Sequence, residues 1–183
     1  MFFIEVLQNY LMRLIVFFLI FFSLNKLAMA EEKKAYFAGG CFWCVEEAFE
    51  KTPGVLKAIS GYTGGDLKNP TYEQVTYNET GHYEAVEVVY DPKLISYKQL
   101  LDVFWKNIDP YDAQGQFCDK GSSYLTAVFY QNDEEKSAFE DSKKKLGKSD
   151  ISDFVTHLKK LDVFYPAEDY HQDYYKNNPI RYK

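Results

Sequence analysis

The spacing of apolar residues changes repeatedly after residue 31 and divides the chain into short strands and longer helices. Apolar runs and two-residue alternation predict strands at 35–38, 55–62, 82–90, 124–130 and 154–158. Apolar residues three and four positions apart predict helices over 41–51 and 96–107. A polar helix is expected over 133–146, and a last helix over 168–177, before Pro179. The two types follow one another irregularly, which favours a single α+β domain: a two-layer α/β sandwich with a mixed central sheet.

The helix predicted over 96–107 has the clearest start and stop signals. Ser96, with Gln99 three residues later, forms a capping-box pattern. Leu100 and Phe104 fall at core spacing within it. Asp109 and Pro110 follow, and proline does not continue a helix. We therefore expect this helix to end near residue 107.

The first thirty residues follow a different pattern. An unbroken apolar run of nine residues, LIVFFLIFF, follows Arg13, and an A-x-A site ends at Ala30. These features predict a secretory signal peptide over 1–30, cleaved near Ala30, which leaves 31–183 as the domain. Translation is expected to start at Met12, because Met12-Arg13 gives a conventional basic n-region. The alternative is an uncleaved membrane anchor, although nine residues are too few to span a bilayer as a helix.

Composition narrows the possible functions. Hydrophobic residues make up 46% of the chain and charged residues 26%, which is typical of a globular protein. The net charge of -6 argues against nucleic acid as a partner, because phosphate binding needs a basic face. Three cysteines are too few, and odd in number, for a disulfide-stapled scaffold. The predicted export places these thiols in an oxidising compartment, secreted or periplasmic.

The densest chemical signal is the segment GGCFWC, which spans Gly39 to Cys44. Two glycines place Cys41 at a turn between a predicted strand and a predicted helix. A thiol at a helix N-terminus lies at the positive end of the helix dipole, which favours the thiolate. The pattern therefore indicates a nucleophilic Cys41, although a buried structural cysteine remains the alternative.

Cys44 follows Cys41 by three residues and opens two further interpretations. The pair matches the spacing of a dithiol that can close into a disulfide, as in a thioredoxin-like oxidoreductase. It also matches half of a zinc site completed by Cys118 and a histidine. A single C-x-x-C makes zinc a weak prediction, and the order of segments fits a thioredoxin domain poorly.

Several longer motifs occur in one order along the chain. They are GGCFWC, GYTGG (61–65), NPTYEQV (69–75), TGHYEAVEVVYDP (80–92), FWKNIDP (104–110), DKGSSY (119–124) and FYPAEDYHQDYYKNNP (164–179). With these motifs, the chain resembles the peptide methionine sulfoxide reductases of the A type over nearly all of residues 34–183. The resemblance implies a ferredoxin-like arrangement of the two-layer fold.

The resemblance also implies roles for five residues. Cys41 would attack the sulfoxide sulfur, and Glu84 would donate a proton to the sulfoxide oxygen, which requires a desolvated carboxyl with a raised pKa. Tyr72 and Tyr124 match tyrosines that hydrogen-bond the sulfoxide oxygen. Asp119 matches an acidic residue that helps to arrange the site.

Other positions take roles through the same resemblance. Phe42 and Trp43 match a pocket for the S-methyl group, and adjacent helical residues point about 100° apart, so one faces the core and the other can line a pocket. Many relatives carry a resolving cysteine in a C-terminal tail, whereas this sequence has no cysteine after Cys118. The resolving step is therefore left open between Cys44, Cys118 and an external thiol.

The resemblance implies reduction of methionine-S-sulfoxide, in proteins and free, through a Cys41 sulfenic acid, with repair of oxidised exported proteins as the outcome. Neither a metal nor an organic cofactor is expected, and the reductant would be thioredoxin or a similar thiol protein. We expect a monomer.

His82 and His171 are expected to serve packing or supporting roles, and His157 to lie on the surface. A dithiol–disulfide oxidoreductase acting through Cys41 and Cys44 is the enzyme alternative, and a zinc-stabilised binding domain is the non-enzyme alternative.

Overall fold

The computed structural model describes residue 12 and residues 31–77, 79–146 and 154–182. The chain divides into two units, Met1–Glu31 and Glu32–Lys183, and all the helices and strands described below belong to the second. Among the described residues, no helix is long and apolar enough to cross a membrane. The predictions for residues 1–30 therefore fall almost entirely outside the described part of the chain.

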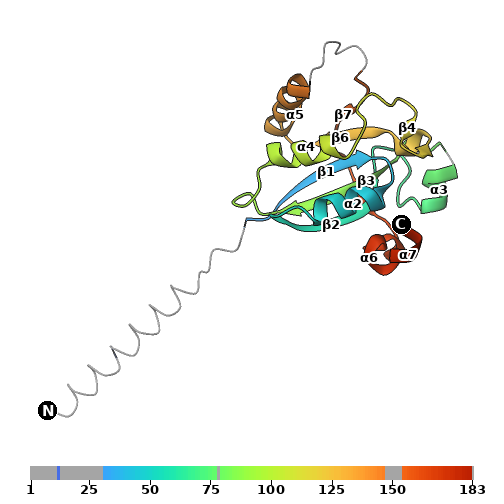
Figure 1. The fold of residues 1–183 in the computed structure, drawn as a ribbon, viewed down its shortest axis with the longest axis horizontal. Helices are drawn as coiled ribbons and strands as arrows, with labels where there is room; N and C mark the ends of the chain where they lie inside the picture. Colours follow the sequence, from blue (N-terminus) through green and yellow to red (C-terminus); the bar gives the residue numbers. More distant parts are fainter. Residues whose placement is uncertain (1–11, 13–30, 78, 147–153, 183) are drawn as a thin grey trace. The chain divides into compact units, whose positions relative to one another are not determined.

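The second unit is a mixed α+β fold built on a sheet of six strands (Figure 1). The strand order is β7-β6-β1-β3-β2-β8, and all neighbours are antiparallel except β6 and β7. The α+β class and the mixed sheet predicted from the sequence are confirmed. The strands are β1 (Lys33–Gly39), β2 (Val55–Thr63), β3 (Tyr83–Tyr90), β6 (Thr126–Tyr130), β7 (His157–Lys160) and β8 (Phe164–Pro166).

The main core lies between one face of the sheet and three helices, α2 (Phe42–Glu50), α4 (Tyr97–Lys106) and α5 (Asp133–Leu146). Because side chains alternate along a strand, Phe37 of β1 faces these helices and stacks on Phe49 at 4.8 Å. Its neighbour Tyr36 faces a smaller cluster on the other side of the sheet. Burying an aromatic side chain such as Phe37 contributes about 2–3 kcal/mol to folding.

Local signals in the sequence explain several boundaries. The capping box at Ser96 is present, with the Ser96 hydroxyl accepting from Gln99 N–H and the Gln99 side chain accepting from Ser96 N–H. The helix predicted over 133–146 has those same bounds in α5. Three acidic residues in its first turn and three lysines in its last complement the helix dipole.

Two predicted elements are wrong in their placement. The strand expected over 154–158 is β7, which begins only at His157. Phe154 instead packs its ring on Trp105, with centroids 5.6 Å apart. The helix expected over 168–177 is broken, because Asp173 adopts a left-handed φ of 54° between a short 3-10 turn and α6 (Tyr174–Asn177).

Several short elements escape the sequence patterns. They are α3 (Tyr72–Tyr77), the hairpin of β4 (Gly115–Gln116) and β5 (Asp119–Lys120), the 3-10 turn Ser122–Tyr124, β8, and α7 (Pro179–Tyr182). The 3-10 turn takes the first residue of the strand predicted over 124–130, so β6 begins at Thr126. These elements carry much of the site described next.

Candidate active site

Cys41 occupies the N-cap position of α2, directly after β1. Gly40 joins the two with a φ of +82°, a conformation that glycine adopts without strain. A Cβ at Gly40 would lie 2.5 Å from the Cβ of Gln116, so the β4–β5 hairpin approaches the backbone where a side chain would stand. Cys41 therefore lies at the turn between strand and helix that the sequence predicted. Its thiol is half-buried, and the two glycines let the hairpin approach beside it.

Glu84 lies at the same helix end, on the central strand β3. Its side chain is only 1% exposed, and its Oε2 accepts a hydrogen bond from Phe42 N–H at 3.0 Å. That N–H belongs to the first turn of α2 and has no partner within the helix. Burial raises the pKa of the Glu84 carboxyl to about 8, although the Phe42 N–H opposes the shift. Glu84 is therefore protonated at neutral pH, as a proton donor requires.

Three more predicted residues surround this carboxyl. Tyr124 lies beside Glu84, where it lowers the pKa of the carboxyl, and Tyr72 lies beside Tyr124. Burial, with Glu84 as the next cause, raises the pKa of both tyrosines, so their hydroxyls keep their protons. Asp119, on β5, lies close enough for its charge to raise the pKa of Glu84. The structure thus brings Cys41, Glu84, Tyr72, Tyr124 and Asp119 together from five separate segments.

The two thiols at the start of α2 lie close enough for the pKa of each to depend on the other. The neighbouring Cys44 raises the pKa of Cys41, and burial acts in the same direction. The same proximity lowers the pKa of Cys44, and the Tyr182 hydroxyl acts in the same direction. Cys44 is exposed, whereas Cys41 is half-buried.

An aromatic wall lies beside Cys41. Phe42 is 1% exposed, whereas its neighbour Trp43 is only half-buried, which matches the expected division between core and pocket. The Trp43 indole N–H donates to His171 Nδ1 at 3.2 Å. Its ring stacks on Tyr174, with centroids 3.6 Å apart and planes 6° apart. The orientation of the indole is therefore fixed from two sides, next to the thiol.

Comparison with known proteins decides the family. A family model described as "Peptide methionine sulfoxide reductase" matches residues 33–183. The chain belongs to the peptide methionine sulfoxide reductase family. It is 53% identical to the Bacillus licheniformis protein "Peptide methionine sulfoxide reductase MsrA" over 157 residues, which cover 84% of this chain and 87% of the relative. The family is one of oxidoreductases that act on peptide methionine sulfoxide, as the sequence motifs predicted.

Solved structures of the same family share the fold. Methionine sulfoxide reductase A of Corynebacterium diphtheriae superposes with a TM-score of 0.71 at 29% identity, covering 84% of this chain and 78% of that one. The reduced form of Mxr1 from Saccharomyces cerevisiae gives a TM-score of 0.73 at 29% identity, covering 83% and 88%. The arrangement around Cys41 therefore lies on a fold that other members of the reductase family share.

Three further residues that the sequence analysis singled out are Cys118, His82 and His157. Cys118 is exposed in the turn of the β4–β5 hairpin, next to Asp119. His82 is buried, accepts from Gly65 N–H at 3.2 Å and contacts the Leu67 carbonyl, which is a packing role. His157 is exposed, as predicted.

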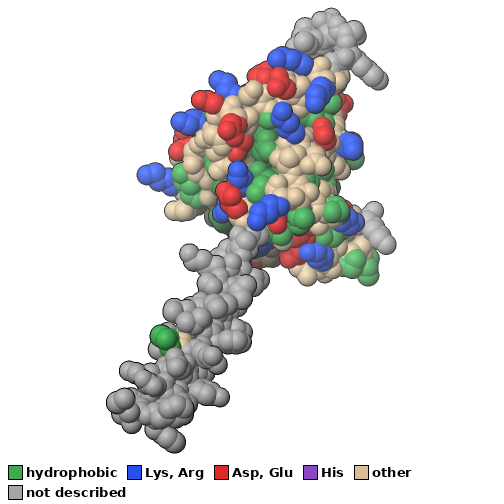
Figure 2. Space-filling view, turned by 90° about the vertical axis from the view of Figure 1, so that its left-hand side faces the viewer, with side chains coloured by type: hydrophobic (Ala, Val, Ile, Leu, Met, Phe, Trp, Pro, Cys, Tyr) green, Lys and Arg blue, Asp and Glu red, His purple; other side chains and the backbone are tan. Residues whose placement is uncertain are grey.

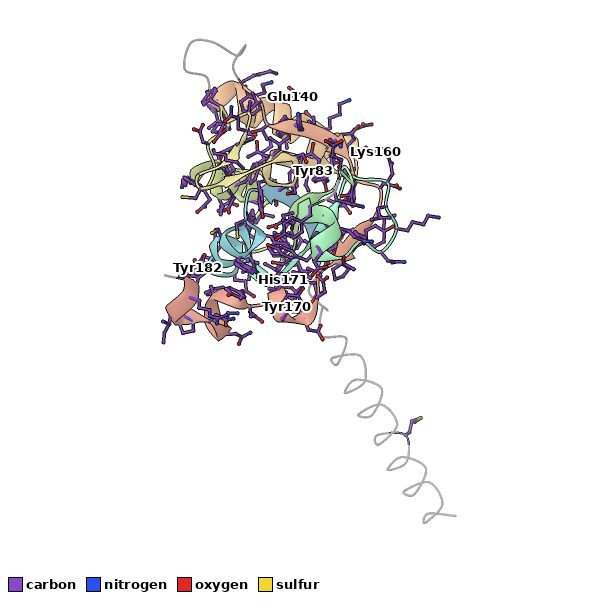
Figure 3. All side chains as sticks on the ribbon, turned by 90° about the vertical axis from the view of Figure 1, so that its right-hand side faces the viewer. Tyr83, Glu140, Lys160, Tyr170, His171 and Tyr182 are labelled. Carbon is purple, nitrogen blue, oxygen red and sulfur yellow. The ribbon has the colours of Figure 1, made fainter. Side chains whose placement is uncertain are left out.

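The C-terminal segment supplies residues that sequence reasoning missed. Tyr182, on α7 (Figure 3), donates to Glu47 Oε2 at 2.6 Å and lies close enough to Cys44 to lower the pKa of its thiol. Glu168 accepts from Tyr72 N–H at 2.9 Å and so fixes the start of α3. Both lie within or just after the motif of residues 164–179, which indicated the family but gave no roles to these positions.

One group of acidic side chains has the spacing of a metal site. Glu46, Glu50 and Asp173 place oxygen atoms within 4.8 Å of one another. Lys176 forms ion pairs with Glu50 and Asp173, both at 2.6 Å. Glu46 accepts from Asp173 N–H and Ser60 Oγ, each at 3.0 Å. The lysine thus supplies the positive charge of this cluster, which ties the C-terminal segment to α2.

Proposed function

We propose that this reductase acts on methionine-S-sulfoxide, free and in proteins, through a sulfenic acid on Cys41. The observation that carries the proposal is the buried Glu84 carboxyl, which accepts from Phe42 N–H at the N-terminus of α2, where Cys41 begins the helix. Burial raises the pKa of this carboxyl to about 8, which suits a proton donor. The choice of the S epimer follows the resemblance to the A type of the family. Thioether and aromatic surfaces attract one another, which suits Trp43 as the contact for the S-methyl group.

The first step oxidises one sulfur and reduces the other. The Cys41 thiolate attacks the sulfoxide sulfur. Glu84 gives its proton to the sulfoxide oxygen, which moves to Cys41. Methionine leaves, and Cys41 becomes a sulfenic acid. The hydroxyls of Tyr72 and Tyr124 hold the oxygen during this transfer.

The second step forms a disulfide between Cys41 and Cys44. The Cys44 thiol attacks the Cys41 sulfenic acid, and its proton leaves with the hydroxyl group as water. Thiols three residues apart at the start of a helix, as in C-x-x-C motifs, can close into a disulfide. Cys44 N–H already bonds the Cys41 carbonyl at 3.1 Å, so no large movement is required. Cys118, in the hairpin turn, is the less favoured partner.

A thioredoxin-like protein then reopens the disulfide, so the enzyme needs neither a metal nor an organic cofactor. The alternative function, a dithiol–disulfide oxidoreductase, uses the same two cysteines. It gives no role to the buried, protonated Glu84 or to the tyrosines around it. Reduction of insulin without turnover of the sulfoxide would favour that alternative.

The deciding experiment follows dabsylated methionine sulfoxide with dithiothreitol, with each epimer assayed separately. The wild type should reduce the S epimer and leave the R epimer unchanged, and Cys41→Ser should abolish the reaction. Cys118→Ser is the matched control and should retain turnover. Near-normal turnover by Cys41→Ser would remove Cys41 as the nucleophile.

Peptide mapping identifies the resolving thiol. The reduced protein is treated with one equivalent of methionine sulfoxide, blocked at its free thiols and digested. A Cys41–Cys44 peptide is expected. A Cys41–Cys118 peptide as the main product would contradict the assignment, and a Cys41 sulfenic acid with both other thiols blocked would point to an external thiol.

Two features of the whole chain belong to the same proposal. The order β6-β1-β3-β2, connected through α2 and α4, supports a ferredoxin-like core. The apolar run before Ala30 supports export and cleavage, so the enzyme would repair oxidised proteins outside the cytoplasm as a monomer.

A further inference from the structure

A surface groove of about 410 Å³ lies beside α2 on the side of Cys44. Its walls include Cys44, Glu47, Lys51, Lys106, Phe117 and Tyr182. None of the residues around the sulfoxide site, such as Cys41, Trp43 or Tyr72, lines it. Figure 3 shows Tyr182 and His171 at separate points of the C-terminal segment, and His171 is the residue that accepts from the Trp43 indole. The groove therefore borders Cys44 and not Cys41.

We propose that this groove is the docking surface for the protein dithiol that reopens the Cys41–Cys44 disulfide, an acidic thioredoxin-like domain whose leading cysteine attacks Cys44. The inference rests on the proposed function, since it requires that disulfide to form. Access gives the first argument. A thiolate must reach one of the two sulfur atoms in line with the bond, and Cys44 is exposed while Cys41 is half-buried against the Glu84 side.

An exposed aromatic ring gives the second argument. Phe117 is 72% exposed at the tip of the β4–β5 hairpin and has a φ of 50°. A positive φ is unusual for a bulky residue and persists only where the surroundings impose it. Here the next residue back, Gln116, is buried and bonds both Asp109 N–H and the Asp109 carbonyl. The hairpin therefore holds an apolar ring in solvent beside Cys44, and aromatic rings are frequent anchors of protein interfaces.

The charge of the groove gives the third argument and indicates that the partner is negatively charged. Lys51 and Lys106 flank the groove, and Glu47 is its acidic wall residue, so the groove is net positive. Lys51 pairs with Glu47 at 2.5 Å, whereas Lys106 forms no ion pair among the described residues. The chain as a whole carries a net charge of -6. A positive groove on an acidic protein steers a negatively charged partner to this one place.

The chemistry of the exchange balances without a further reactant. The leading thiolate of the partner attacks Cys44 Sγ, the Cys41–Cys44 bond breaks, and its electron pair remains on Cys41, which takes up a proton. The second thiol of the partner then attacks the intermolecular bond. Cys44 is released as a thiol, and the partner leaves with its own disulfide.

The test compares two reductants on one set of variants. A purified bacterial thioredoxin, recycled by its reductase and NADPH, is compared with dithiothreitol at saturating methionine sulfoxide. For the double variant Phe117→Ser, Lys106→Glu, we expect the ratio of thioredoxin-driven to dithiothreitol-driven kcat/KM to fall at least tenfold. Dithiothreitol is small and uncharged and needs no docking surface, so each variant's own dithiothreitol rate serves as its reference.

The matched control is Leu94→Ser, Lys98→Glu. Leu94 is an exposed apolar residue outside the groove, and Lys98 lies on α4 with Lys106, so the polarity and charge changes are the same. This control should keep the wild-type ratio. A ratio within twofold of wild type in the groove variant would overturn the proposal, and a raised KM for a sulfoxide peptide instead would assign the groove to substrate. Loss of the dithiothreitol reaction in the wild type would contradict the proposed function, not the docking surface.

Discussion

Burial of Glu84 has two effects. It keeps the carboxyl uncharged near neutral pH, and it makes the fold less stable at alkaline pH, where the buried group must ionise. Its carboxyl is 1% exposed and its pKa is raised to about 8. A catalytic acid works best when its pKa lies near the operating pH. Glu87, three residues further along β3, is also buried but faces the other way and pairs with Lys34 at 3.0 Å. Glu84 is therefore the reactive carboxyl of β3, and Glu87 is a structural one that serves as its control.

Replacing Glu84 by glutamine should slow the chemical step. The amide keeps the shape and the bond from Phe42 N–H but cannot supply the proton, so the single-turnover rate should fall by roughly 10²–10⁴. In the wild type the rate should fall as the pH rises through about 8, where Glu84 loses its proton. Rapid-quench measurements between pH 5 and pH 10 check both statements. Glu87→Gln is the control, and a Glu84→Gln rate within twofold of wild type would contradict the role.

The same substitution should stabilise the protein at high pH. A carboxyl whose pKa rises from its ordinary value of 4.5 to about 8 on folding binds more protons in the folded state. Its contribution to stability is therefore present below pH 4.5 and is lost as the pH rises to about 8. Glu84→Gln removes this loss, so its Tm should exceed that of the wild type by roughly 10 °C at pH 9 but by little at pH 5. Equal Tm differences at both pH values would show that Glu84 is not held uncharged by burial.

The segment after β8, residues 167–177, packs against α2 and is called the strap below. Gln172 accepts from Ser60 N–H at 3.1 Å and donates to the Ser60 and Ala167 carbonyls at 3.0 Å. One side chain thus ties this segment to β2. His171 and Tyr174 lie close to Gln172 in the sequence and hold the Trp43 ring. The position of Trp43 therefore depends on the hydrogen bonds that Gln172 makes to β2.

Gln172→Ala should loosen the strap without touching the thiols. Three lost hydrogen bonds should cost about 2–3 kcal/mol. Amide hydrogen exchange should accelerate over residues 167–177, and KM for the sulfoxide should rise several-fold while kcat changes less. Asn177→Ala, which removes one exposed amide bond in the same segment, is the control. Unchanged exchange over 167–177 would refute the strap.

The long elements could be predicted from the sequence because their signals are local. The capping box of Ser96 and Gln99 marks the start of α4. The acidic first turn and basic last turn mark the two ends of α5. The hairpin β4–β5 and strand β8 could not be predicted, because each is too short to show a periodic pattern of apolar residues. They form because they pair with other strands, as Phe164 pairs with Thr63. Cys41 was predictable from its glycines, whereas Tyr182 was not, since nothing local indicates that it reaches Cys44.

At the scale of the whole molecule, the fold begins where the predicted leader ends. β1 starts at Lys33, two residues after Glu31, and pairs with β3 from that first residue. The face in Figure 2 shows acidic and basic side chains interspersed. Cleavage near Ala30 would leave every element of this fold in place.

The mature protein should therefore begin at Glu31. Expression of the full chain in a Gram-negative host, followed by fractionation, should give a periplasmic protein whose intact mass matches residues 31–183. The control is a variant with Ala28 and Ala30 replaced by bulky residues, which should block cleavage. A wild-type mass that still contains the apolar run would indicate a membrane anchor.

The stack of Trp43 on Tyr174 gives the enzyme an optical reporter of its own. The chain has two tryptophans, and Trp105 is buried in the main core, where it bonds Ser142. Trp43 stands within the first turn of α2, between the two cysteines, and its indole N–H is bonded to His171. Its emission should change when a sulfoxide enters and again when the neighbouring thiols become a disulfide. In a Trp105→Phe background, stopped-flow fluorescence could follow both half-reactions without any label.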